Sequence, residues 1–291
     1  MKLHSPIATC LCFYSIRLAA ILVLLMALVA PAKAQDIDGA KILSGNAVEG
    51  GLIIARTDPT NQIMLDDAAI KIGENGVFVI GFHRDSDVPV RLRIVAPDGS
   101  VKTSFLSPRQ RDYNIQRIDG LKSTMVTPPA TVLARIKSDG NAVRTARQRE
   151  APLGDFWRGF DWPALGRISG IYGSQRILNG QPRQPHYGID IAAPTGTPVY
   201  APASGLVTLV KDLYFSGWTV VIAHGLGVNS SFLHFDRVDV ETGMIVERGG
   251  LIGKIGATGR ATGPHLDWRI DWQGRRIDPG LLVGAMPDPA T

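Results

Sequence analysis

Cysteine is nearly absent from this 291-residue chain, and its two examples, Cys10 and Cys12, both lie close to the amino terminus. They precede the apolar run of an amino-terminal leader, residues 1–34, which is described below. A cysteine that carries a lipid stands instead at the cleavage site, so these two are wrongly placed for lipid attachment. The chain after the leader has no cysteine, which excludes disulfides from the mature protein. An exported chain of this kind depends on its hydrophobic core alone for stability.

Long apolar runs are also lacking. The longest near the amino terminus, residues 18–29, follows Lys2 and Arg17 and is too short to span a bilayer comfortably. Ala32 and Ala34 then form a small-residue cleavage pattern. We interpret residues 1–34 as a signal peptide cut before Gln35, the alternative being an uncleaved anchor. The mature protein is expected to have no stable membrane anchor and to reside in the periplasm of a double-membraned bacterium.

A strong charge of either sign is missing as well. The chain has 31 Lys or Arg and 26 Asp or Glu, and three of the basic residues lie in the leader, which leaves 28 against 26. This near balance gives no reason to expect a nucleic-acid partner. Only residues 102–149 are lopsided, with ten basic and three acidic side chains. That stretch is either a surface for an anionic polymer or a solvated helix face.

Short strands separated by turns are the main pattern of residues 35–108, which we predict to form a small β-sandwich domain. The β-rich runs are residues 50–55, 69–72, 77–82 and 90–95. Leu92 and Ile94 alternate with arginines, as expected for a sheet with one wet face. Asn75 and Gly76 predict a tight hairpin between two of the runs.

A basic linker arm, residues 109–155, is expected to follow. Its first part looks extended. Residues 130–149 carry apolar side chains at near-helical spacing and predict a helix, weakened by Asp139 and Gly140 in its middle.

Two pairs of potential metal ligands organise the remaining chain, residues 156–291. His186 and Asp190 are four residues apart and His265 and Asp267 two apart. Both spacings put each pair on one face of a strand, and the neighbouring sequence favours strands. Imidazole and carboxylate are the ligand types of a catalytic zinc, which keeps one position open for water.

The surrounding text resembles the lysostaphin-type, or LytM-like, zinc metallopeptidases over residues 162–277. Several motifs occur in the family's order: ISGIYGSQR at 168–176, HYGIDIAAPTGTPVYA at 186–201, GLV at 205–207, VIAHG at 221–225, FLH at 232–234 and GGLIGKIGATGRATGPHL at 249–266. The resemblance implies a mainly β fold, an antiparallel β-sheet domain of the duplicated hybrid motif type. It also implies hydrolysis of peptide bonds in peptidoglycan.

The resemblance further implies one zinc ion per chain, with His186 and Asp190 as ligands and His234 and His265 as the catalytic pair. One departure stands out, because the family normally has a second histidine where this chain has Asp267. We treat Asp267 as the candidate third ligand, since carboxylate oxygen also binds zinc. A second carboxylate would leave the ion less electrophilic and favour oxygen-loving metals such as manganese.

Arg176 and Asn179 precede the first ligand and are candidate substrate-binding residues, because arginine suits carboxylate groups. We interpret the protein as a zinc metalloendopeptidase acting on peptidoglycan stem peptides or cross-bridges in cell-wall remodelling. A second interpretation, prompted by Asp267, is a catalytically inert protein that binds the cell wall or activates a partner amidase. A third is a general periplasmic protease. The oligomeric state does not follow from the sequence.

Overall fold

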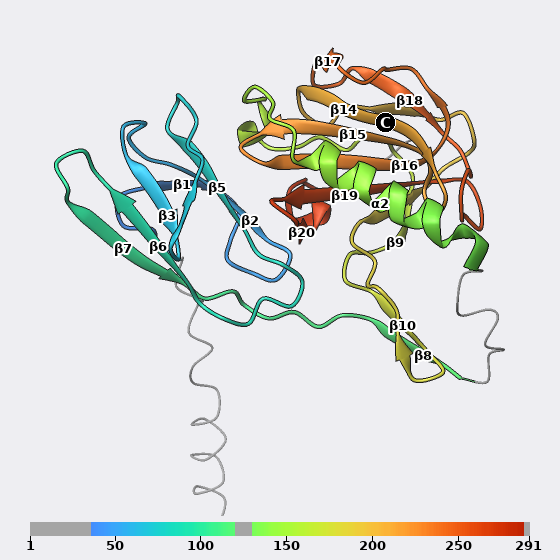
Figure 1. Cartoon of the computed structure of the whole chain (residues 1–291), viewed down its shortest axis with the longest axis horizontal. Coiled ribbons are helices and arrows are strands. Elements are labelled where there is room, and N and C mark those ends of the chain that lie inside the picture. The colour runs from blue at the N-terminus through green and yellow to red at the C-terminus, as the bar shows by residue number, and fades with distance from the viewer. Residues whose placement is uncertain (1–35, 120–129, 288–291) are drawn as a thin grey trace, which may run out of the picture. The chain divides into compact units, whose positions relative to one another are not determined.

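Strands dominate residues 36–119 and 130–287, which are the residues that the computed structural model describes (Figure 1). The predicted leader, residues 1–34, lies outside them. The described residues after Gln35 form one compact unit. Among the described helices, none is long and apolar enough to cross a membrane.

Two antiparallel sheets make up the amino-terminal region, with strand orders β1-β2-β5 and β4-β3-β6-β7. Side chains from both sheets, such as Ile53, Ile63 and Phe78, are buried in one hydrophobic core. The predicted small β-sandwich is therefore confirmed. Its strands are β1 (Lys41–Ser44), β2 (Leu52–Arg56), β3 (Gln62–Leu65), β4 (Ala68–Ile70), β5 (Val77–Gly81), β6 (Val90–Val95) and β7 (Val101–Leu106).

Strand β6 of this sandwich has the burial pattern that its sequence predicts, but the turn at Asn75 and Gly76 does not join the two strands that were predicted to pair. Leu92 and Ile94 are buried on β6, and Arg91 and Arg93, which alternate with them, are more exposed. Asn75 and Gly76 do form a turn, in which Gly76 has a φ of 77°. The predicted hairpin is wrong, however, because β4 and β5 on either side of the turn belong to different sheets. Local turn chemistry does not specify the partner of a strand.

In its described residues, 109–119 and 130–155, the arm contains strand β8, the short turn η2 and helix α2. Strand β8 (Ile115–Ile118) pairs in parallel with β10 (Gln175–Leu178), which also pairs with β11 (Gln181–Pro182). A short 3-10 turn, η2 (Ala130–Val132), leads into α2 (Leu133–Arg147), so the predicted helix is present.

Helix α2 lies against the large carboxy-terminal sheet (Figure 1). Asp139, in the middle of the helix, is buried and its Oδ2 accepts a hydrogen bond of 2.8 Å from the backbone N–H of Tyr214. Arg135 Nη2 pairs with Asp212 Oδ2 at 3.1 Å. These contacts fix the helix beside β14 and β15.

The carboxy-terminal sheet has ten strands, with the main path β17-β14-β15-β16-β19-β12-β9 and β13, β18 and β20 attached to it. All of its pairings are antiparallel, which confirms the predicted fold class. Its elements are η3 (Phe156–Arg158), β9 (Arg167–Gly170), β12 (Ile189–Ala192), β13 (Pro198–Tyr200), β14 (Gly205–Leu213), β15 (Gly217–Gly225), β16 (Val228–Val238), β17 (Ile245–Val246), β18 (Leu251–Ile255), β19 (His265–Trp272), β20 (Arg275–Ile277) and η4 (Pro279–Leu281).

The sandwich contacts the large sheet through polar groups as well as through the core. Arg275 Nη1 donates a hydrogen bond of 2.8 Å to the carbonyl oxygen of Gly81 on β5. Arg111 Nη1 pairs with the buried Asp278 at 2.8 Å. Arg275 begins β20 and Asp278 follows it, so these contacts join the sandwich and the arm to the strand that pairs with β19.

Candidate metal centre

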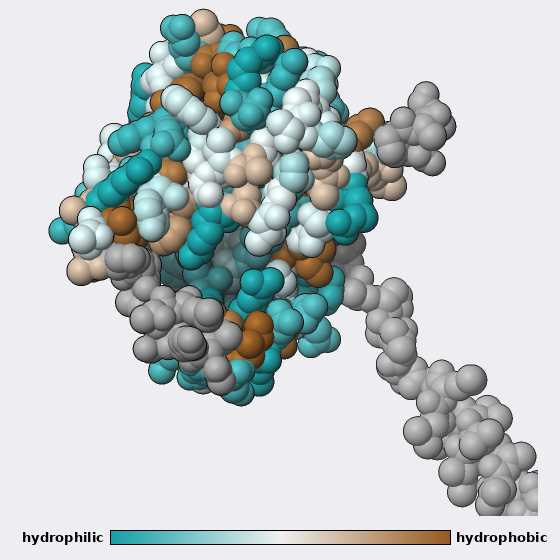
Figure 2. Space-filling model, turned by 90° about the vertical axis from the view of Figure 1, so that its right-hand side faces the viewer, coloured by the Kyte–Doolittle hydropathy of each residue, from teal (hydrophilic) through white to brown (hydrophobic). Residues whose placement is uncertain are grey.

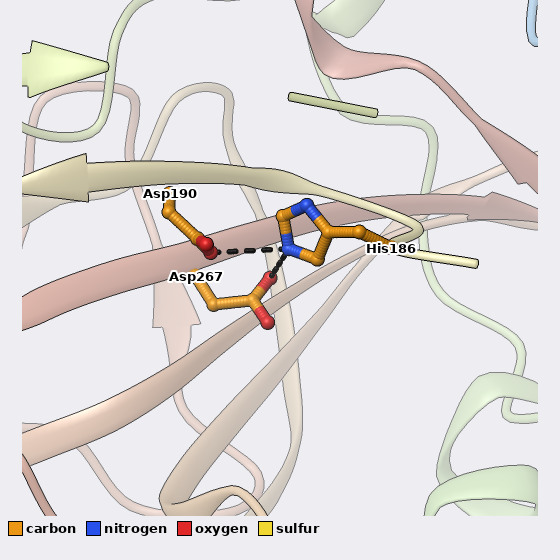
Figure 3. Close-up of side chains that lie close together, drawn as sticks. All are labelled: His186, Asp190 and Asp267. Atoms are coloured by element: carbon orange, nitrogen blue, oxygen red, sulfur yellow. Dashed lines mark ion pairs between the residues drawn. The ribbon is translucent and has the colours of Figure 1, made fainter. Parts of the chain in front are cut away.

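Strands β12 and β19 bring two carboxylates together, because Asp190 on β12 is the cross-strand partner of Asp267 on β19. His265 and Asp267 lie on the same face of β19, as predicted. His186 does not share a strand with Asp190, contrary to the strand interpretation of their spacing. It lies in the loop before β12, and its imidazole reaches back to the carboxylates (Figure 3).

The donor atoms of His186, Asp190 and Asp267 converge and lie within 4.8 Å of one another. His186 Nε2 is 3.0 Å from Asp190 Oδ1 and 3.6 Å from Asp267 Oδ1 (Figure 3). Among the described residues, His186 Nε2 and Asp190 Oδ1 are buried and, apart from their ion pairs with the other members of the cluster and with His265, have no hydrogen-bond partner. Buried polar atoms without partners are costly unless they bind something else.

This donor set fits a zinc ion. Tetrahedral zinc with ligands at about 2.0–2.2 Å has donor atoms about 3.3–3.6 Å apart, close to the separations of His186 Nε2 from the two carboxylate oxygens. His186 Nδ1 lies 3.3 Å from the carbonyl oxygen of Ile171 and can donate its proton there. That hydrogen bond leaves the lone pair of Nε2 directed at the carboxylates.

The two carboxylates also determine the charge of His186. Burial by itself lowers the pKa of this imidazole, but the neighbouring Asp190 and Asp267 outweigh it and raise the pKa to about 10. An ion at this position has to replace the proton that the carboxylates otherwise attract.

Arg269 holds Asp267 in place from the same face of β19. Its Nε lies 2.9 Å from Asp267 Oδ1 and its Nη2 lies 2.5 Å from Oδ2, a bidentate arrangement. Asp267 is only 3% exposed, and burial opposes its charge. Arg269 and His186 outweigh that effect and hold the pKa of Asp267 far below its usual range. The sequence analysis did not identify Arg269, although an Asp-x-Arg pair on a strand was a visible signal.

His234 and His265 lie side by side near this cluster, with ring centroids 4.7 Å apart. Nδ1 of His234 is 2.7 Å from the carbonyl oxygen of Thr258, and Nδ1 of His265 is 2.8 Å from that of Gly263. Donation of both Nδ1 protons leaves each Nε2 available for chemistry. His265 Nε2 is 3.9 Å from Asp190 Oδ1, which places it beside the candidate metal ligands.

An irregularity in β16 positions His234. The residue has a φ of 69°, which is unusual for a side chain other than glycine. Around it β16 changes partner, from β19 at Leu233 to β18 at Phe235, and its register with β15 shifts. A bulge of this kind redirects a side chain, and His234 consequently joins His265.

His224, by contrast, is a structural residue. It is fully buried, with Nδ1 2.9 Å from the carbonyl oxygen of Ser204 and Nε2 2.8 Å from Ser230 Oγ. Burial lowers its pKa to about 4, so the imidazole is neutral. With both nitrogens hydrogen-bonded, it has no free lone pair for a metal.

Two glycines that the sequence analysis did not identify make room for the ligands. A Cβ at Gly170 would lie 2.2 Å from Asp190 Oδ2, and one at Gly188 would lie 2.6 Å from Asp267 Oδ1. Both positions therefore require the absence of a side chain. The only signal in the sequence was their place inside the quoted motifs.

Arg176 and Asn179 lie on a different element from the cluster. Arg176 is on β10 and exposed, and Asn179 occupies the turn between β10 and β11 with a φ of 49°. Neither is among the residues that line the groove described next. A substrate-binding role for them stays a prediction.

A groove of about 2100 Å³ contains the cluster. His186, Asp190, His234, His265 and Asp267 all line it. Helix α2 contributes one wall, from Ile136 to Arg147, and the segment 148–154 continues it. A hollow with hydrophilic surface is visible on the face shown in Figure 2. The cluster is therefore open to a large ligand rather than enclosed.

Comparison with known proteins places this region in one family. Residues 184–279 match the model described as peptidase family M23. Over 141 residues the chain is 36% identical to the peptidoglycan DD-endopeptidase ShyA of Vibrio cholerae, covering 48% of this chain and 30% of that protein. Over 105 residues it is 40% identical to the DD-carboxypeptidase/endopeptidase Mpg of Neisseria meningitidis, covering 36% and 24%. The chain spans less than a third of the length of these curated relatives.

A solved structure is similar over nearly the whole chain. It is the crystal structure of a Pseudomonas aeruginosa protein assigned to peptidase M23, with 30% identity and a TM-score of 0.66. The match covers 84% of this chain and 97% of that one, so it includes the amino-terminal sandwich as well as the large sheet. Together with the match of residues 184–279, this similarity shows that the chain belongs to peptidase family M23.

Proposed function

We propose that this protein is a zinc metalloendopeptidase that hydrolyses peptide bonds in peptidoglycan. The observation that carries the proposal is the convergence of His186, Asp190 and Asp267 in an open groove. Among the described residues, His186 Nε2 and Asp190 Oδ1 have only ion-pair contacts, and neither has a regular hydrogen-bond partner. These three side chains would hold one zinc ion. Three protein ligands and an open position are the arrangement of catalytic zinc sites.

We assign the proton transfers of the hydrolysis to the neighbouring imidazoles of His234 and His265. A bound zinc supplies a Lewis acid that polarises a peptide carbonyl and makes water more acidic. Burial lowers the pKa of His234, so its imidazole is neutral near pH 7 and can accept a proton at Nε2. His265 is anchored beside Asp190 through Nδ1, which faces the carbonyl oxygen of Gly263. When its Nε2 also carries a proton, His265 is placed to donate a hydrogen bond from Nε2 to a carbonyl oxygen that gains negative charge.

The relatives support the choice of substrate. ShyA is named as a peptidoglycan DD-endopeptidase and Mpg as a DD-carboxypeptidase/endopeptidase. We extend that substrate to this chain as part of the proposal. Since peptidoglycan lies outside the cytoplasmic membrane, the proposal includes export, with cleavage near Ala34 and Gln35 and a periplasmic location.

A second candidate is a catalytically inert protein that binds the cell wall or activates an amidase. The ion pair between Asp267 and Arg269 favours it, because a carboxylate held by a guanidinium has less charge to offer a metal. The two candidates differ in one measurable property, since an inert binding protein has no need of tightly bound zinc.

Metal analysis and digestion of purified peptidoglycan sacculi, carried out together, test the proposal. We expect one zinc per chain and release of uncross-linked fragments by the wild-type protein. An Asp190→Ala variant should keep its fold and lose both properties. A folded wild-type protein with no zinc and no cleavage would establish the inert candidate instead.

A further inference from the structure

The last residue of α2 reaches into the groove beyond the candidate metal centre. Arg147 Nη2 donates a hydrogen bond of 2.9 Å to Ser231 Oγ on β16. The carbonyl oxygen of Arg147 accepts one of 3.2 Å from Asn229 Nδ2. Arg147 and Ser231 both line the groove. The arm thus contributes a cation to a groove whose candidate metal ligands and paired histidines all come from residues 184–279.

Arg147 differs from Arg269 and Arg276, which also line the groove, in having no ion pair with a carboxylate. Arg269 pairs with Asp267, and Arg276 Nη1 lies 3.3 Å from Asp271 Oδ2. Among residues 36–119 and 130–287, no ion pair of Arg147 with a carboxylate occurs, and its buried Nε lacks a hydrogen-bond partner. Burial and the like charge of Arg276 lower the pKa of Arg147 to about 9 against the opposing effect of Asp271, which leaves Arg147 charged at neutral pH. A partly buried guanidinium that has a hydroxyl but no carboxylate as partner favours the binding of an anion.

The position of this cation relative to the metal centre follows from the strand register. Ser231 is the cross-strand partner of Arg269, which lies two residues from Asp267 on the same face of β19. Two strand residues span about 7 Å. An extended peptide covers a similar distance with about two residues. A carboxylate bound by Arg147 would therefore lie within about two residues of a peptide bond at the metal centre.

We propose that Arg147, together with Ser231 and Arg276, forms a subsite that binds a free carboxylate of the peptide substrate close to the scissile bond. The proposal rests on the peptidase function proposed above and narrows its substrates to peptides that carry such a carboxylate. A guanidinium recognises a carboxylate through two parallel hydrogen bonds, which gives orientation as well as affinity. Helix α2 is then a part of the substrate-binding wall, rather than a cover over the groove.

The test uses two forms of one substrate. A cross-linked muropeptide dimer is prepared with its free carboxylates intact, and a second portion with those carboxylates converted to carboxamides. For the zinc-loaded wild-type chain we expect kcat/KM for the acid form to exceed that for the amide form by about tenfold or more, the size expected for a charge-assisted hydrogen bond. Arg147→Gln should remove that preference by slowing only the acid form, mainly through KM.

Two further variants separate this role from a structural one. Arg147→Lys keeps the positive charge and should keep part of the preference, which matters if the glutamine variant folds poorly. Lys137→Gln removes an exposed charge from the same helix outside the groove lining and should leave the preference unchanged. Equal rates for acid and amide forms with wild type would overturn the subsite. So would an Arg147→Gln variant that is faster on both forms, because α2 would then only obstruct the groove.

Binding without cleavage keeps the subsite testable if the peptidase function is wrong. Both dimers are titrated by calorimetry into the Asp190→Ala chain, with and without Arg147→Gln. Tighter binding of the acid form that disappears with Arg147→Gln supports the subsite even when no dimer is cleaved. Equal binding of the two forms contradicts it, whatever the peptidase assay shows.

Discussion

The two faces of β19 carry opposite kinds of residue. On the groove face, His265, Asp267, Arg269 and Asp271 are hydrogen-bonded or ion-paired and line the groove. On the core face, the alternating residues Leu266, Trp268, Ile270 and Trp272 are all fully or almost fully buried. One strand therefore supplies both the reactive groups and the packing that fixes them.

This division shows why the site can hold charges so close together. A strand anchored by large apolar side chains on one face can impose positions on polar groups of the other face, even where two carboxylates approach one imidazole. The core face is expected to determine stability, and the groove face metal binding and activity. Each of the following variants tests whether the core face of β19 determines stability and the groove face determines metal binding and activity.

The largest effect is expected from His186→Ala. Loss of the only imidazole among the three candidate ligands should reduce zinc from about one per chain to near zero and abolish peptidoglycan cleavage. The fold should persist, because His186 lies in a loop outside the strands. Metal analysis measures the zinc content and circular dichroism checks that the fold persists. An unchanged zinc content would rule out the site.

Trp268→Ala should have the largest effect on stability. Trp268 is fully buried, with Trp162 and Phe160 at ring-centroid distances of 6.1 and 6.5 Å. Truncation to alanine is expected to lower the free energy of unfolding by about 3–5 kcal/mol, measured by urea denaturation.

Trp268→Phe is the matched control for that change. The indole Nε1 of Trp268 has no hydrogen-bond partner in the part of the chain that the structure describes. Phenylalanine therefore keeps most of the packing and loses no hydrogen bond, and should cost clearly less than alanine. Similar losses for both variants would argue against packing as the role of this face.

A coupled effect is expected for Asp267→His and Arg269→Glu. Histidine alone at position 267 leaves Arg269 without its carboxylate beside a metal centre, so zinc affinity should fall by at least about tenfold. Adding Arg269→Glu restores a carboxylate next to the imidazole and should recover the affinity. Competition with a chelator measures both variants. A single Asp267→His variant that binds zinc as tightly as the double variant would refute the coupling.

A smaller effect should follow from Gly188→Ala. This variant alters the groove face by steric crowding and leaves its charges unchanged. The new Cβ would lie 2.6 Å from Asp267 Oδ1 and 2.7 Å from Arg269 Cγ, so the pair has to move. We expect zinc affinity several-fold to about tenfold weaker. Gly263→Ala, with no atom within 4 Å of its added Cβ, is the control and should bind zinc normally.

The sequence by itself determined the β-rich fold class and the family. Alternation within single strands correctly placed Leu92 and Ile94 in the sandwich core and His265 with Asp267 on one face. These features depend on side-chain periodicity along one stretch of chain, which is fixed once a strand forms.

Only the tertiary structure decided how separate stretches meet. Pairing of β12 with β19 brings Asp190 beside Asp267, a bulge in β16 turns His234 toward His265, and packing of α2 against the sheet brings Arg147 to the groove. The failed hairpin at Gly76 has the same origin. Strand partners, bulges and helix docking are chosen by the summed burial and hydrogen bonding of distant segments, and no local pattern contains that sum.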